Sequence, residues 1–129
     1  MSFCTAVNCM DGRVQLPVIA FLKERFAVEH VDTITEPGAN RILGRQTSVA
    51  LIASILERIR ISVEHHNSVG IAVAGHHDCA GNPGGKDQQT SDTVAAVEYI
   101  RKRCSRYGRL EVIGLWVDEN WSVSEVSID

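Results

Sequence analysis

The chain has 129 residues, enough for one domain with a buried core, and its composition of 44% hydrophobic and 22% charged residues is ordinary for a globular protein. A formal net charge of -3 without a long basic run argues against nucleic-acid binding, and no apolar run approaches the ~18–20 residues of a membrane span. The N-terminus lacks the charged-then-apolar order of a signal peptide. We therefore expect a cytoplasmic protein without membrane or nucleic-acid partners, whose four cysteines are thiols or metal ligands.

The first half of the chain alternates segments of strand and helix character. Residues 2–8 form a short strand of mixed polarity, and a proline placed where a first helical turn tolerates it opens an amphipathic helix over residues 16–26. Residues 31–35 are expected to be a strand, closed by the turn-like stretch EPGAN. Apolar residues at helical spacing then predict a second helix over residues 47–63.

The second half continues the alternation. The nearly continuous apolar run 69–75 is typical of a buried parallel strand. After a glycine-rich loop, Ser91 or Asp92 is expected to cap a third helix that ends near residue 107, and residues 110–117 predict a fourth strand. We predict a single α/β domain over residues 1–129, with a mainly parallel sheet of about four strands flanked by helices.

The tail, residues 118–129, alternates apolar and polar side chains and predicts a short edge strand or an interface arm. A sheet of this kind has edges that invite pairing with another chain, and Trp116 and Trp121 supply aromatic area of the kind enriched at interfaces. We expect a homodimer or a higher even oligomer built on these contacts. The alternative is that the tail folds back on its own subunit.

Two polar clusters each follow a predicted strand. NCMDGR, residues 8–13, places Cys9, Asp11 and Arg13 at alternate positions, and GHHDCAG, residues 75–81, contains His76 and Cys79. Open α/β sheets build their sites at the carboxyl ends of strands, so both clusters are expected at one sheet edge. His-x-x-Cys with Cys9 as a third donor is a set that suits Zn²⁺, whereas an isolated Cys9 would be a small buried hydrophobe.

The Cys-x-Asp-x-Arg and His-x-x-Cys motifs, in this order, resemble the signature of the β-class carbonic anhydrases. The resemblance covers residues 2–117 and identifies a short, compact member. It implies the β-carbonic anhydrase fold, one Zn²⁺ per chain on Cys9, His76 and Cys79, and a carboxylate–guanidinium dyad of Asp11 and Arg13. It also implies an active-site mouth near a dimer interface.

The chemistry is consistent with these roles. A zinc ion with two thiolates and one imidazole keeps a fourth position for water and lowers the pKa of that water. A carboxylate can orient the resulting hydroxide, but Asp11 so close to zinc could become a fourth ligand in a closed state. The bidentate fork of Arg13 would hold it off the metal.

The function expected from the resemblance is hydration of CO2 to bicarbonate by a carbonate dehydratase, a zinc lyase. Two alternatives stay open: a hydrolase of a CO2 analogue such as carbonyl sulfide or carbon disulfide, and a non-catalytic zinc-binding or regulatory protein on the same fold. Ala80 stands where the family usually has glycine, so metal binding carries over more directly than catalysis.

Overall fold

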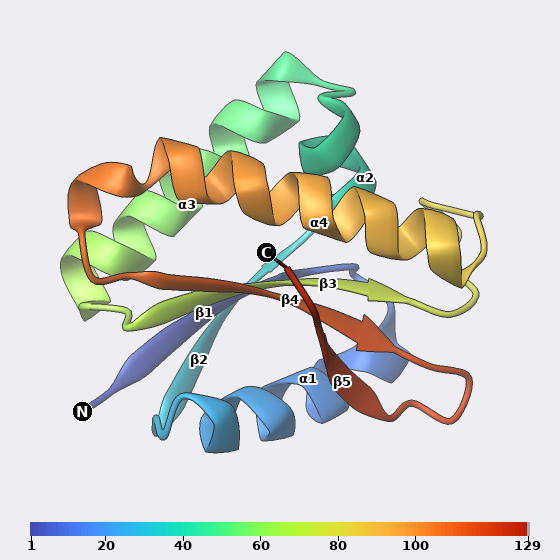
Figure 1. Ribbon diagram of the computed structural model, residues 1–129. Helices are drawn as coiled ribbons and strands as arrows, with labels where there is room; N and C mark the ends of the chain where they lie inside the picture. Colours follow the sequence, from blue (N-terminus) through green and yellow to red (C-terminus); the bar gives the residue numbers. More distant parts are fainter. Residues whose placement is uncertain (129) are drawn as a thin grey trace.

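The computed structural model describes residues 1–128 and has a five-stranded sheet with the strand order β2-β1-β3-β4-β5 (Figure 1). The strands are β1 Phe3–Asn8, β2 His30–Thr35, β3 Gly70–His76, β4 Glu111–Val117 and β5 Val123–Val126. The first four are parallel, and β5 is antiparallel to β4. The predicted α/β class is confirmed, with one strand more than the four expected.

Helices cover both faces of the sheet (Figure 1). They are α1 Gly12–Arg25, α2 Ala39–Arg45, α3 Val49–His66 and α4 Lys86–Arg103, followed by a 3-10 turn at Ser105–Tyr107. Successive side chains of a strand point to opposite faces, so Ala6 of β1 packs on the α1 side while Val7 packs against α2, α3 and α4. Within residues 1–128, none of the helices is long and apolar enough to cross a membrane.

Two predicted helix starts and one predicted turn were wrong. α1 begins at Gly12 because the side chain of Asp11 accepts a hydrogen bond from the Arg13 amide and caps the helix. α4 begins at Lys86, so Ser91 and Asp92 lie inside the helix, where Asp92 binds side chains of other elements. The expected turn EPGAN also differs, since α2 begins within it at Ala39.

The tail lies on its own chain. β5 pairs with β4 from Val117 opposite Val123 to Gly114 opposite Val126. Trp121 and Val123 pack against the α1-side core, and Ile128 against the core on the other face. β2 and β5 are therefore the two edges of the sheet in residues 1–128; Asp129, the end of the predicted tail segment, lies outside the described residues.

Candidate metal centre and active site

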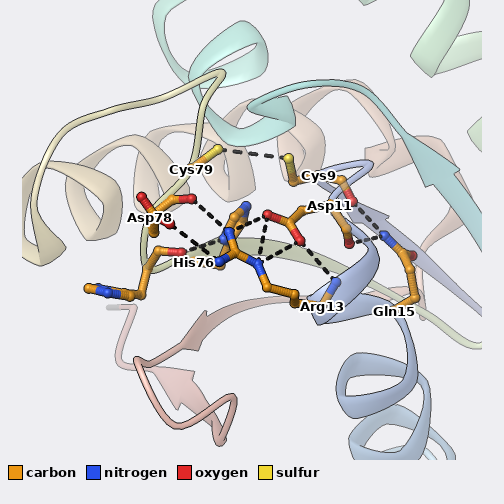
Figure 2. Close-up of polar contacts among 8 residues, drawn as sticks. Cys9, Asp11, Arg13, Gln15, His76, Asp78 and Cys79 are labelled. Atoms are coloured by element: carbon orange, nitrogen blue, oxygen red, sulfur yellow. Dashed lines mark hydrogen bonds and ion pairs between the residues drawn. The ribbon is translucent and has the colours of Figure 1, made fainter.

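The two polar clusters meet at the carboxyl ends of β1 and β3, which are neighbours in the sheet. Cys9 directly follows β1, His76 is the last residue of β3, and Cys79 lies in the loop after it. The sulfur atoms of Cys9 and Cys79 are 3.8 Å apart (Figure 2). One donor atom from each of the three residues lies within 4.8 Å of the others, all three residues are buried, and the group could hold a metal ion.

The imidazole of His76 has one satisfied and one unsatisfied nitrogen. Nδ1 lies 2.7 Å from the carbonyl oxygen of His77, which has no proton to give, so Nδ1 carries the hydrogen and donates it. This leaves a lone pair on Nε2, an atom that is buried and finds no hydrogen-bond partner in residues 1–128. A backbone carbonyl on one nitrogen and a free lone pair on the other is the arrangement of metal-ligating histidines.

The two cysteines differ in acidity. The thiol of Cys79 donates to the sulfur of Cys9, and this hydrogen bond lowers the pKa of Cys9 in spite of its burial. The same hydrogen bond raises the pKa of Cys79. A thiolate beside an imidazole lone pair is the chemistry of a soft-metal site, and a set of two cysteines and one histidine fits tetrahedral Zn²⁺ with one position left open.

Asp11 and Arg13 form a bidentate ion pair beside this group (Figure 2). Arg13 donates from Nε to Oδ1 of Asp11 at 3.0 Å and from Nη2 to Oδ2 at 2.7 Å, and the backbone amide of Arg13 also donates to Oδ1 at 2.9 Å. These bonds hold the pKa of Asp11 at about 2, below its ordinary value of 3.8, and the guanidinium pKa is raised in return. The carboxylate is therefore ionised at any physiological pH.

A buried polar network anchors the loop that carries Cys79. Asn82 donates to the carboxylate of Asp92 at 2.9 Å, and Gln89 donates to the carbonyl of Asn82, so α4 holds the loop from two positions. Asn40 of α2 joins Gln89 at 2.9 Å. Burial of these side chains away from water makes each bond costly to break, which fixes the loop relative to both helices.

A family model described as "Putative carbonic anhydrase" matches residues 1–127 of the sequence. The chain belongs to this carbonic anhydrase family. None of the curated proteins matches it significantly.

Solved structures show the same fold. The carbonic anhydrase of Glaciozyma antarctica matches with a TM-score of 0.57 and 13% identity, over 95% of this chain and 81% of that one. The beta-carbonic anhydrase CafD of Aspergillus fumigatus matches with a TM-score of 0.58 and 10% identity, over 98% of this chain and 90% of that one. A tetrameric beta-carbonic anhydrase of Sordaria macrospora matches with a TM-score of 0.54 and 15% identity, over 96% of this chain and 80% of that one. The β-class fold indicated by the two motifs is thereby confirmed.

A cavity of about 520 Å³ opens over the site of this carbonic anhydrase family member. It is lined by Asp11 and Arg13 and by two stretches of the loop after β3, residues 77–80 and 83–85. His77 is exposed, as expected of a loop residue, and its side chain does not join the three buried donors. The cavity gives a small molecule access from solvent to the ion pair and to the edge of the metal-binding group.

Two polar residues of the site were not assigned a role from the sequence. Gln15 donates to the carbonyl oxygens of Cys9 and Asp11, both at 2.8 Å, and so fixes the backbone between β1 and α1. Both partners are backbone carbonyls, so the spacing of side chains in the sequence gives no signal for this contact. Asp78 accepts hydrogen bonds from Arg13, from Nη1 to its carboxylate at 3.3 Å and from Nη2 to its carbonyl oxygen at 3.1 Å. The two residues are 65 positions apart, so no local sequence pattern predicts this contact.

The ion pair predicts a specific titration. We expect the Asp11 carboxyl to titrate near pH 2 in the parent protein and close to its ordinary value of 3.8 in Arg13→Ala, read by carbon-13 NMR of the carboxyl groups. Because the pKa is lower in the folded chain than in the unfolded one, the contribution of the pair to the free energy of unfolding is complete above about pH 4. It is lost as the pH falls towards 2.

The control is Arg60→Ala, which removes the exposed pair of Arg60 with Glu57 on α3 and should leave the Asp11 titration unchanged. An Asp11 carboxyl that titrates at the same pH in the parent and in Arg13→Ala would contradict the prediction.

Proposed function

We propose that this protein is a zinc-dependent carbonic anhydrase, a carbonate dehydratase of the lyase class that hydrates CO2 to bicarbonate. In this proposal Cys9, His76 and Cys79 hold one Zn²⁺ per chain, and Asp11 and Arg13 act on the reacting groups. The observation that carries it is the buried Nε2 lone pair of His76 beside two cysteine sulfurs. Family membership and the fold shared with beta-carbonic anhydrases support the choice of reaction.

The donor set determines what the metal would contribute. Zn²⁺ held by two thiolates and a neutral imidazole would polarise a water molecule in its open position and bring the pKa of that water towards neutrality. His76 is already the tautomer needed, because its Nδ1–H is committed to the carbonyl of His77. The hydrogen bond from Cys79 lowers the pKa of Cys9 and so favours its thiolate, and metal binding would displace the remaining thiol proton of the pair.

Asp11 would orient the water and accept its hydrogen bond. Three groups of Arg13 donate to the carboxylate: the backbone amide to Oδ1, Nη2 to Oδ2, and Nε to Oδ1 at 3.0 Å with a longer contact to Oδ2 at 3.3 Å. A carboxylate has about four lone-pair positions, so Asp11 would accept the hydrogen bond of the water at one that Arg13 does not hold closely. The same bonds oppose the closed state in which Asp11 becomes a fourth metal ligand, because that state would break them. Arg13 therefore sets the balance between an oriented water and a blocked site.

We also propose a homodimer, or a higher even oligomer, and a cytoplasmic location. The sheet of residues 1–128 ends in β2 on one side and β5 on the other, and such edges pair readily with a second copy. The Sordaria macrospora enzymes with this fold are tetramers. A reducing cytoplasm would keep Cys9 and Cys79, whose sulfurs are close together, as the thiolates that zinc needs.

The metal assignment predicts about one zinc per chain in purified protein, measured by elemental analysis. Cys9→Ala and Cys79→Ala should lose most of the metal, because each removes one of three ligands. Cys4→Ala and Cys104→Ala are matched controls, since both cysteines are buried in the hydrophobic cores, and should keep it. Full zinc retention in Cys9→Ala that is folded by circular dichroism would overturn the ligand set.

The reaction assignment predicts that zinc-loaded protein hydrates CO2 in a stopped-flow indicator assay. Arg13→Ala should keep its zinc and lose activity by ~10²-fold or more, the order typical of removing one positioned charged group. Arg60→Ala, far from the site on α3, serves as the control. An Arg13→Ala protein as active as the parent would contradict the role of the ion pair.

The same assay separates the alternative functions. Zinc-loaded parent protein that fails to hydrate CO2 but consumes carbonyl sulfide or carbon disulfide would be a hydrolase of a CO2 analogue. Zinc-loaded protein inert towards all three would be the non-catalytic binding protein.

We predict an oligomer with an even number of subunits. Sedimentation velocity of the full chain at micromolar concentration should show a dimer or a multiple of it, because two sheet edges are open to pairing. A single monomer peak that persists on concentration would rule out the oligomer.

A further inference from the structure

The guanidinium of Arg13 is contacted from three separate parts of the chain. Asp11 takes two of its N–H groups, and Asp78, in the loop after β3, takes others through its carboxylate and its carbonyl oxygen. These contacts use the edges of the planar group (Figure 2). The side chain is nevertheless 45% exposed, and an exposed arginine held by ion pairs alone retains much rotamer freedom.

The guanidinium of Arg13 also lies over the ring face of Trp121. The central carbon of the guanidinium, Cζ, lies 4.4 Å from the centroid of the indole ring, within the range of a cation–π interaction. Edge contacts with carboxylates and contact with an aromatic ring together restrain both the position and the rotation of the group. His77 meets the same ring edge-on, with centroids 6.5 Å apart, and limits the movement of the indole.

The backbone at Trp121 indicates that this placement is imposed. Trp121 has a φ of 60°, in the left-handed region that bulky residues avoid. The loop holds it there through Asp118, whose Oδ1 accepts hydrogen bonds from the amides of Asn120 and Ser122, both at 2.9 Å. The Trp121 amide in turn donates to the Asp118 carbonyl at 2.9 Å. Backbone strain that the surroundings enforce in this way is typical of functional positions.

We propose that Trp121 is a positioning residue, whose indole face, together with Asp78, locks the Arg13 guanidinium in the orientation that serves Asp11. The inference deepens the proposed function and rests on it for its catalytic meaning, but the restraint on Arg13 exists with or without metal. A cation–π contact at such an exposed site shifts a rotamer equilibrium by about two- to five-fold. Removing the ring should therefore increase the population of Arg13 turned away from Asp11 by that factor.

The restraint can be read without any activity. In nitrogen-15-labelled full-length protein, the Nε–Hε resonance of Arg13, assigned by its loss in Arg13→Lys, reports hydrogen exchange and mobility at the atom that contacts Asp11. We expect about two- to five-fold faster exchange in Trp121→Leu, which keeps apolar bulk but has no π face. Trp121→Phe should restore most of the protection, and Glu119→Gln, an exposed position of the same loop, should leave it at the parent value.

Zinc content and thermal unfolding of the same variants verify that the site and the fold persist, and CO2 hydration is measured in parallel. Exchange in Trp121→Leu equal to the parent would overturn the proposal, and so would equal exchange in the Leu and Phe variants, since the effect would then come from bulk. Faster Arg13 exchange in Trp121→Leu than in the parent, combined with a zinc-loaded parent that does not hydrate CO2, would reject the proposed function and still support the positioning role.

Discussion

The parallel pairing of β1 with β3 is the constraint on which the site depends. The register sets Val7 opposite Val73, which brings the end of β1 beside the end of β3 and places Cys9 near His76 and Cys79. β3 is buried along its whole length, and a slip of one residue would turn its side chains to the wrong faces. The hydrophobic core therefore fixes the positions of the donor atoms.

Three loops at this edge each carry part of the site. The β1–α1 connection carries Cys9 and the Asp11 cap, so the residue that begins α1 also belongs to the site. The β3–α4 loop carries Cys79 and is held to α4 by buried bonds of Asn82. The β4–β5 loop brings Trp121 over Arg13. Each loop contacts the next through a charged or polar group, so the site has little freedom once the sheet has formed.

The sequence predicted those parts of the site that follow strands directly, because strand ends share an edge and the residue types there do not suit a core. It missed α2 since the EPGAN stretch carries turn signals, while the helix is stabilised by tertiary contact: a Cβ on Gly44 would lie 2.4 Å from the backbone oxygen of Asp92. Ser91 and Asp92 looked like caps, yet Asp92 is committed to Arg45 and Asn82. Propensity alone cannot show such long-range partners.

Trp121 is the clearest case of information that pattern reasoning lacks. An aromatic residue in a short alternating tail suggests an interface, but alternation does not say whether the partner surface belongs to the same chain. In the structure the hairpin of β4 and β5 meets α1 at both ends. Trp121 contacts Arg13 in the first turn of α1. Arg25, at the end of α1, forms ion pairs with Glu111 of β4 and Glu125 of β5. β5 is also a sheet edge, and the β4–β5 loop that leads into it carries Trp121. A second chain paired with β5 would therefore restrain this loop and, through Trp121, the position of Arg13.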